Sequence, residues 1–208
     1  LLIKHEEYKR VLPDFGSPKW IYLSSIGEDS EQYQVELADY LESHPDIKVA
    51  FQPGTYQIRW GTEGTMGRLY KRAEVSFCNK EEAQKILNTE ESDIKKLMEL
   101  MRALGPKIVV ITDGPNGAYA YDGTTYWQMP LYPDPKPPVD RTGAGDAFSS
   151  TFTVALALGK TIPEALAWGP INSMSVVQDV GAQRGLLTRE QIEDYLAKAP
   201  AEYRPKEI

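Results

Sequence analysis

Cysteine is almost absent from this chain. Cys78 is the only cysteine among 208 residues, so no disulfide framework can form, which fits the reducing conditions of the cytoplasm. Cys78 closes the apolar stretch 75–77, so we expect it to be buried at the end of a strand rather than reactive. We find no apolar run of membrane length and no signal peptide. We therefore expect a cytoplasmic protein that does not enter a membrane.

Positive charge is also scarce. The chain carries 23 Lys and Arg against 30 Asp and Glu, which gives a net charge of −7. This balance argues against nucleic acid as a partner, because phosphate backbones require clustered Lys and Arg. It does not exclude a small phosphate ligand, which backbone N–H groups can hold without positive side chains.

Two common phosphate-binding motifs are missing. No Gly-x-x-x-x-Gly-Lys-Ser/Thr sequence occurs, so the chain is not a P-loop protein. The dinucleotide fingerprint Gly-x-Gly-x-x-Gly fails as well, because Phe148 occupies the position of the third glycine. A phosphate site in this chain must therefore be built differently.

Residues 140–148 contain the strongest candidate for such a site. They read Asp-Arg-Thr-Gly-Ala-Gly-Asp-Ala-Phe, and an apolar, Ala-rich run follows at 149–158. The N–H groups of Gly143, Ala144 and Gly145 can point at an anion, helped by the positive end of the helix dipole. Asp146 would lie beside that anion and could take a proton from an attacking hydroxyl. The alternative is an ordinary turn in which Asp146 only favours the helix N-terminus, and the residues alone leave both open.

Strands and helices alternate along the chain. This order favours an α/β layered fold with a mostly parallel sheet. The segment 130–138 holds five prolines, and we interpret it as an extended connection inside one domain rather than a domain linker. Strands are expected at 20–23, 47–51, 73–77, 107–112, 117–121 and 124–129, and helices at 29–42, 61–70, 80–88, 91–103, 145–158, 162–177 and 189–198.

Three further segments contain polar residues or glycines at informative positions. Asn79 and Glu82 follow the third strand with the spacing of a capping box. The stretch 112–117 follows the most β-branched strand and is either a plain turn or a loop whose glycines let a ligand approach the backbone. Asn172 is polar on an otherwise apolar helix, where such a residue is often a core or surface group whose hydrogen bonds are all made.

Taken together, these motifs resemble the ribokinase-like (PfkB) family of carbohydrate and nucleoside kinases. The string at 140–148 closely resembles the C-terminal signature of that family, although Arg141 stands where Thr is common. The resemblance implies a three-layer α/β/α fold and ATP-dependent transfer of a phosphoryl group to an alcohol of a sugar or nucleoside. It implies Asp146 as the catalytic base and an anion hole made by Gly143, Ala144 and Gly145. For ATP and metals it implies the following residues: Thr112, Gly114, Gly117 and Asn172 at the nucleotide, Asn79 and Glu82 at magnesium, and Asp140 and Thr142 at a monovalent cation such as potassium.

The resemblance covers residues 18–198 and only the C-terminal part of the family pattern. The first strands of the sheet, the lid and the Gly-Gly substrate motif are not visible, and Leu1–Lys4 is interpreted as a remnant of a lid strand. We therefore expect residues 1–208 to form one incomplete α/β nucleotide-binding and catalytic domain. It would be completed by self-association or by a separate N-terminal half. The alternative function is a nucleotide-binding fragment without catalysis, or half of a split kinase.

Overall fold

The computed structural model describes residues 18–208. The strand remnant expected at 1–4 lies outside the described residues. The chain divides into two compact units, which meet in sequence between Val109 and Val110, and each unit is described by itself. The expectation of a single incomplete domain remains a prediction.

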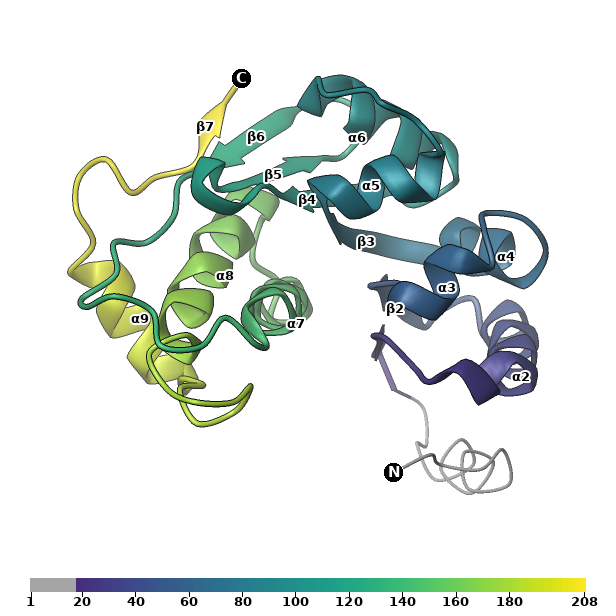
Figure 1. Ribbon diagram of the computed structural model, residues 1–208, viewed down its shortest axis with the longest axis horizontal. Coiled ribbons are helices and arrows are strands. Elements are labelled where there is room, and N and C mark those ends of the chain that lie inside the picture. The colour runs from purple at the N-terminus through teal and green to yellow at the C-terminus, as the bar shows by residue number, and fades with distance from the viewer. Residues whose placement is uncertain (1–17) are drawn as a thin grey trace. The chain divides into compact units, whose positions relative to one another are not determined.

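Unit 1 is built on parallel strands (Figure 1). Strands β1 (Trp20–Leu23), β2 (Lys48–Phe51) and β3 (Ala73–Asn79) pair in that order, with Leu23 opposite Phe51. Val49, Ala50 and Phe51 are fully buried, because helices must cover both faces of a parallel sheet. Cys78 is buried near the end of β3, as expected.

Short helices connect these strands. The 3₁₀ turn η2 (Glu28–Ser30) leads into α2 (Glu31–Ser43), which packs on α4 (Gly64–Arg72). Arg68 reinforces this packing, because its Nε donates to Glu42 over 2.7 Å. Helix α3 (Thr55–Arg59) was not expected from the sequence, and α5 (Lys80–Leu87) packs on α6 (Ile94–Ala103).

Unit 2 contains an antiparallel meander. Strand β4 (Ile108–Thr112) crosses the boundary between the units, and the 3₁₀ turn η3 (Gly114–Asn116) leads from it into β5 (Ala118–Tyr121). Strand β5 pairs with β6 (Tyr126–Met129) as the expected hairpin, whose turn is held by Asp122 through backbone bonds from Thr124 and Thr125. The sequence missed β7 (Lys206–Glu207), which pairs with β6, because two exposed polar residues carry no strand pattern.

Three helices complete unit 2. Helices α7 (Ala144–Ala157) and α8 (Ile162–Val176) pack closely together, and α9 (Arg189–Ala197) packs on α8. Gly169 permits the close approach of α8 to α7, since a Cβ there would meet the ring of Phe148 at 2.7 Å. The Tyr203 hydroxyl donates to the Ala167 carbonyl over 2.6 Å and holds the C-terminal segment on α8.

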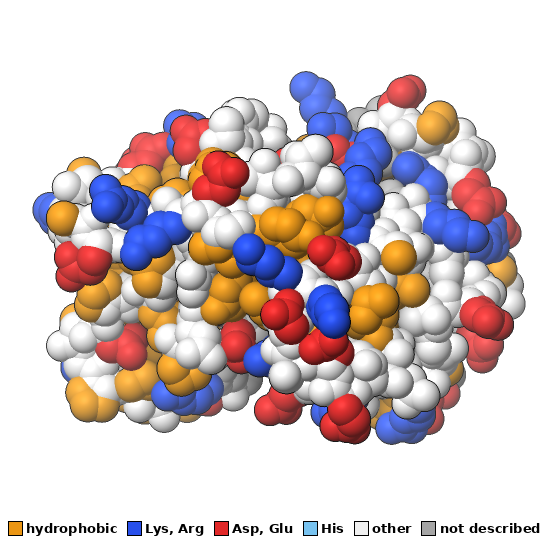
Figure 2. Space-filling view, turned by 90° about the horizontal axis from the view of Figure 1, so that it is seen from above, with side chains coloured by type: hydrophobic (Ala, Val, Ile, Leu, Met, Phe, Trp, Pro, Cys, Tyr) orange, Lys and Arg blue, Asp and Glu red, His pale blue; other side chains and the backbone are white. Residues whose placement is uncertain are grey.

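The exposed surface carries charges of both signs. Figure 2 shows Lys and Arg as well as Asp and Glu across one face, with hydrophobic side chains between them. Among residues 18–208, no helix is long and apolar enough to cross a membrane.

Candidate active site

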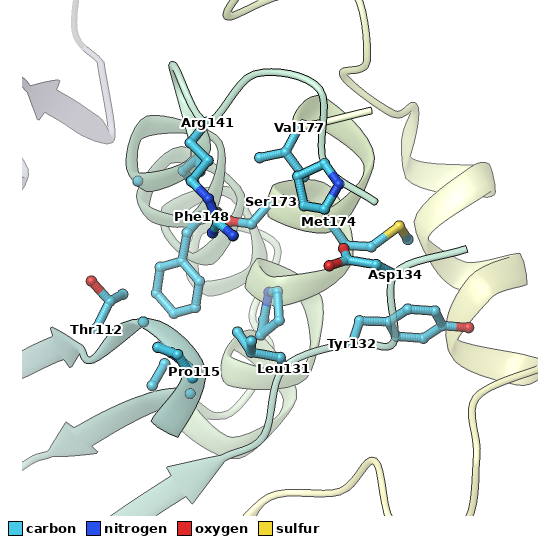
Figure 3. A pocket seen from close by; sticks show the side chains of 17 residues that line it. Thr112, Pro115, Leu131, Tyr132, Asp134, Arg141, Phe148, Ser173, Met174 and Val177 are labelled. Atoms are coloured by element: carbon cyan, nitrogen blue, oxygen red, sulfur yellow. Dashed lines mark hydrogen bonds between the residues drawn. The ribbon is translucent and has the colours of Figure 1, made fainter. Parts of the chain in front are cut away.

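A cavity of about 250 Å³ lies entirely within unit 2. It brings together the loop after β4, the start of α7, one face of α8 and the proline-rich segment (Figure 3). Its lining residues are Thr112, Gly114, Pro115, Gly117, Ala118, Leu131, Tyr132, Asp134, Pro138, Arg141, Ala144, Gly145, Phe148, Pro170, Ser173, Met174 and Val177. Two separate segments singled out in the sequence, 112–117 and 143–145, thus contribute to one cavity.

The first of these segments is a tight turn held by its own backbone. The Asp113 N–H donates to the Gly117 carbonyl over 2.8 Å, and the Gly117 N–H donates to the Gly114 carbonyl over 3.1 Å. Gly114 and Gly117 have φ of +47° and +88°, a region that favours glycine. At Gly117 a Cβ would also meet the Met129 carbonyl oxygen at 2.1 Å. The turn therefore favours glycine at 114 and has no room for a Cβ at 117, and Thr112, Gly114 and Gly117 all line the cavity.

The second segment starts helix α7. Gly143 is its N-cap with φ +83°, and the first helical bond runs from the Ala147 N–H to the Gly143 carbonyl over 2.8 Å. The N–H groups at the start of the helix therefore have no carbonyl partner within the helix itself. Of the three expected anion-hole residues, Ala144 and Gly145 line the cavity. The Ala144 N–H lies 3.3 Å from the Arg141 carbonyl oxygen, so it is partly engaged.

Asp146 lies in the first turn of α7 and is exposed. It does not belong to the cavity lining, but it directly follows Gly145, which does. Its side chain lies in the first turn, at the positive end of the helix dipole. An exposed carboxylate next to an N–H cradle is able to accept a proton from a hydroxyl group.

Asp140 organises the loop before α7. Its two oxygens accept the Thr142 N–H over 2.9 Å and the Gly181 N–H over 3.0 Å. Hydrogen bonds from Thr142, and then the one from Gly181, hold the pKa of Asp140 below its ordinary value. Asp140 thus joins the signature loop to the turn after α8, and neither it nor Thr142 lines the cavity.

Asn172 faces the protein interior. It is 6% exposed, its Nδ2 donates to Thr151 Oγ1 over 2.7 Å, and its Oδ1 accepts the Leu187 N–H over 2.9 Å. Asn172 does not line the cavity, whereas its neighbour Ser173 does. These contacts indicate that Asn172 is a buried residue whose hydrogen bonds are made inside the protein, rather than a nucleotide contact. The preceding Ile171 is fully buried as well, because this stretch of α8 is covered on several sides.

Asn79 and Glu82 lie in unit 1 and form a complete capping box. Asn79 Oδ1 accepts the Glu82 N–H, and Glu82 Oε2 accepts the Asn79 N–H, each over 2.8 Å. This confirms the helix-capping interpretation of the pair. Among the described residues, no group of three or more His, Cys, Asp or Glu side chains could hold a metal ion.

The sequence did not identify the apolar walls of the cavity. Leu131 and Pro138 come from the proline-rich segment, while Phe148, Met174 and Val177 come from α7 and the end of α8. The segment is fixed on α9 through Tyr132, whose hydroxyl donates to the Tyr195 carbonyl over 3.1 Å. Burial raises the pKa of that hydroxyl above its ordinary value. The run of prolines was the only sequence signal, and it indicated an extended path but no ligand.

Charged side chains are few at the cavity. Of the described residues that line it, Arg141 carries positive charge and Asp134 carries negative charge. Figure 3 shows the Arg141 side chain extending toward Phe148 and Ser173, while Asp134 lies nearer to Met174 and Tyr132. The cavity therefore combines apolar walls, glycine-rich backbone and the N-terminus of a long helix.

Comparison with known structures shows the fold. Ribokinase from Arabidopsis thaliana, complexed with ribose and ATP, superposes with a TM-score of 0.74 at 20% identity, covering 94% of this chain and 60% of that one. Ribokinase from Thermotoga maritima gives a TM-score of 0.72 at 24% identity over 92% and 62% of the two chains. The expected ribokinase-like α/β/α fold is confirmed.

Curated relatives include kinases of different substrates. Cytidine kinase of Thermococcus kodakarensis is 33% identical over 137 residues, which is 65% of this chain and 48% of that protein. Ribokinase of Bacillus subtilis is 40% identical over 95 residues, 46% of this chain and 32% of that protein. The chain thus spans about half, or less, of the length of these relatives.

The model of the pfkB family of carbohydrate kinases matches residues 3–189. This match includes the loop after β4, the signature loop and the face of α8 that together line the cavity. The chain belongs to the pfkB family of carbohydrate kinases.

Proposed function

We propose that this chain carries the nucleotide-binding and catalytic part of an ATP-dependent kinase that phosphorylates an alcohol group of a sugar or nucleoside. The observation that carries the proposal is the convergence of segments 112–117 and 143–145 on one cavity beside Asp146. Relatives that include a ribokinase and a cytidine kinase support the substrate class.

The cavity suits a nucleotide. The apolar side chains of Leu131, Phe148, Met174 and Val177 form walls that can enclose a planar base. The backbone of 112–117 carries no bulky side chain at its glycines, so a ribose or phosphate can approach it closely. The start of α7 offers N–H groups and the positive end of the helix dipole to phosphate oxygens. ATP, when bound, supplies the phosphoryl group.

In the proposed reaction, Asp146 would accept the proton of the substrate hydroxyl as that oxygen attacks the terminal phosphoryl group of ATP; the bond between the β and γ phosphates breaks and ADP leaves. The N–H groups of Gly145 and its neighbours in the first turn of α7 hold the developing negative charge on the phosphoryl oxygens. Gly143 ends the preceding loop in the left-handed region as the N-cap of this helix. The proton acceptor and the anion hole would then be supplied by the same helical turn.

Metal ions are part of the proposal. Magnesium would bind through water near Glu82, because this ion usually keeps several of its waters and a carboxylate that contacts one of them suffices. The loop that contains Asp140 and Thr142 would supply ligands to a monovalent cation such as potassium. Asp140 would supply carboxylate oxygens to this site, and the same oxygens accept the N–H groups of Thr142 and Gly181. Phosphofructokinase-2 from Escherichia coli, which has a similar fold, has been solved in complex with potassium.

The test of the proposal is the Asp146→Asn variant. We expect its turnover to fall by about 10²–10⁴, the usual contribution of a general base. ATP affinity, measured by calorimetry, should stay within about twofold of wild type, since base catalysis acts in the transition state. Asp194→Asn is the matched control, because it removes the same charge from the exposed surface of α9, where Asp194 pairs with Lys198. Full turnover in Asp146→Asn would exclude Asp146 as the base.

The same activity assay distinguishes a kinase from the alternative, a nucleotide-binding fragment without catalysis or half of a split kinase. ADP release would be followed over a panel of sugars and nucleosides, first with the chain alone and then at increasing chain concentration. ATP binding without turnover at any concentration would indicate a nucleotide-binding fragment. Activity that rises steeply with concentration would indicate completion by self-association, and recovery on adding an N-terminal half would indicate a split kinase.

A further inference from the structure

Arg141 occupies an unusual place in the signature loop. It precedes the glycines that start α7, and it lines the cavity between the apolar walls and the N-terminus of that helix. Its side chain extends into the cavity toward Phe148 and Ser173 (Figure 3). A long cationic side chain in this position reaches the space that a ligand at the helix N-terminus would fill.

Within residues 18–208, no ion pair neutralises the charge of Arg141. No described residue forms a hydrogen bond or ion pair with its guanidinium, and Asp134 on the same cavity does not pair with it. No other described residue that lines the cavity is positively charged. Among the described residues that line the cavity, this guanidinium is therefore the one side chain whose charge attracts an anion.

The backbone N–H groups alone compensate only part of the negative charge of a polyphosphate. The Thr142 N–H is used by Asp140 over 2.9 Å, and the Ala144 N–H is partly used by the Arg141 carbonyl. This leaves mainly the first-turn N–H groups from Gly145 onward and a helix-dipole charge of about +0.5. A nucleoside triphosphate carries several negative charges, so a further donor with full positive charge would strengthen its binding considerably.

We propose that the Arg141 guanidinium binds the phosphate chain of the donor nucleotide. This inference rests on the proposed function and adds a residue to it. The planar guanidinium can form two parallel hydrogen bonds with phosphate oxygens, which the point charge of a lysine cannot reproduce. The apolar walls bind the base and the start of α7, together with Arg141, binds the phosphates.

The experiment compares ATP with adenosine on the same protein. Arg141→Met removes the charge but keeps an unbranched side chain, and Arg141→Lys keeps the charge without the planar fork. ATP binding is measured by calorimetry, and adenosine by competition against ATP, so that both ligands report one site. Arg189→Met is the matched control, because it removes an equal charge from the surface of α9, where Arg189 pairs with Glu193.

We expect Arg141→Met to weaken ATP binding about 10- to 100-fold, as for the loss of a charged hydrogen bond. Adenosine affinity should stay within twofold, and Arg141→Lys should lie between Arg141→Met and wild type. Unchanged ATP affinity in Arg141→Met would overturn the inference, and so would an equal loss for adenosine, which would indicate a packing role. Failure of the wild-type chain to bind ATP at all would instead contradict the proposed function.

Discussion

Gly143→Ala tests whether the backbone before α7 is as constrained as the structure indicates. Gly143 has φ +83°, and a left-handed conformation costs a non-glycine residue about 1–2 kcal/mol. A Cβ at this position would also lie 2.5 Å from Ala182 Cβ and 2.8 Å from its Cα. Such overpacking typically costs a further ~1–3 kcal/mol. We therefore expect the variant to lose about 2–5 kcal/mol of unfolding free energy.

The chain offers a matched control at the other end of α7. Gly159 has the same φ of +83°, but a Cβ there would meet nothing within 4 Å. Gly159→Ala should therefore lose only the backbone contribution of about 1–2 kcal/mol. The difference between the two variants then isolates the contact of residue 143 with Ala182.

A second-site change tests that contact directly. Ala182→Gly removes the nearest atom but leaves the Cα in place, so the double variant should recover part of the loss and not all of it. Unfolding in urea, followed by circular dichroism, gives the free energies. If Gly143→Ala is no less stable than Gly159→Ala, or if Ala182→Gly recovers nothing, the close approach of residues 143 and 182 is refuted.

Two further substitutions concern polar groups near the cavity. The lowered pKa of Asp140, caused first by its bonds with Thr142, means that the carboxylate stabilises the fold above its unfolded pKa of about 4 and that this contribution is lost as pH falls through the folded pKa. Asp140→Asn should thus be less stable than wild type at pH 7, and urea titrations should show the difference shrinking in acid; a difference independent of pH would contradict this. Asn172→Leu leaves Thr151 Oγ1 and the Leu187 N–H without their partner, so we expect a loss of about 2–4 kcal/mol in the same assay. ATP affinity should be unchanged where the variant is folded, whereas a selective loss of ATP binding would restore Asn172 as a nucleotide contact.

Local patterns in the sequence were sufficient for most of the secondary structure. The β-branched run before Thr112 became β4, and the Asp122-Gly123 turn became a hairpin. Elements without such a pattern were missed. Helix α3 is only five residues long, and β7 depends on its pairing with β6.

The candidate site was predictable where backbone conformation requires glycine. Gly114, Gly117 and Gly143 all have positive φ, so the backbone conformation favours glycine at each position whatever surrounds it. The sequence therefore indicated the turns and the helix start correctly. For Asn172 it indicated only polarity on an apolar helix, and two explanations of that polarity remained open.

The sequence by itself determined the glycine turns, the start of α7 with Asp146 in its first turn, and the family. The tertiary structure alone decided which segments share a cavity, because contacts between residues far apart in the chain depend on packing and not on local pattern. It placed the proline-rich segment and the face of α8 against the signature loop, and it turned Asn172 toward the interior. It also placed Arg141 in the lining of the cavity, which no local pattern indicated.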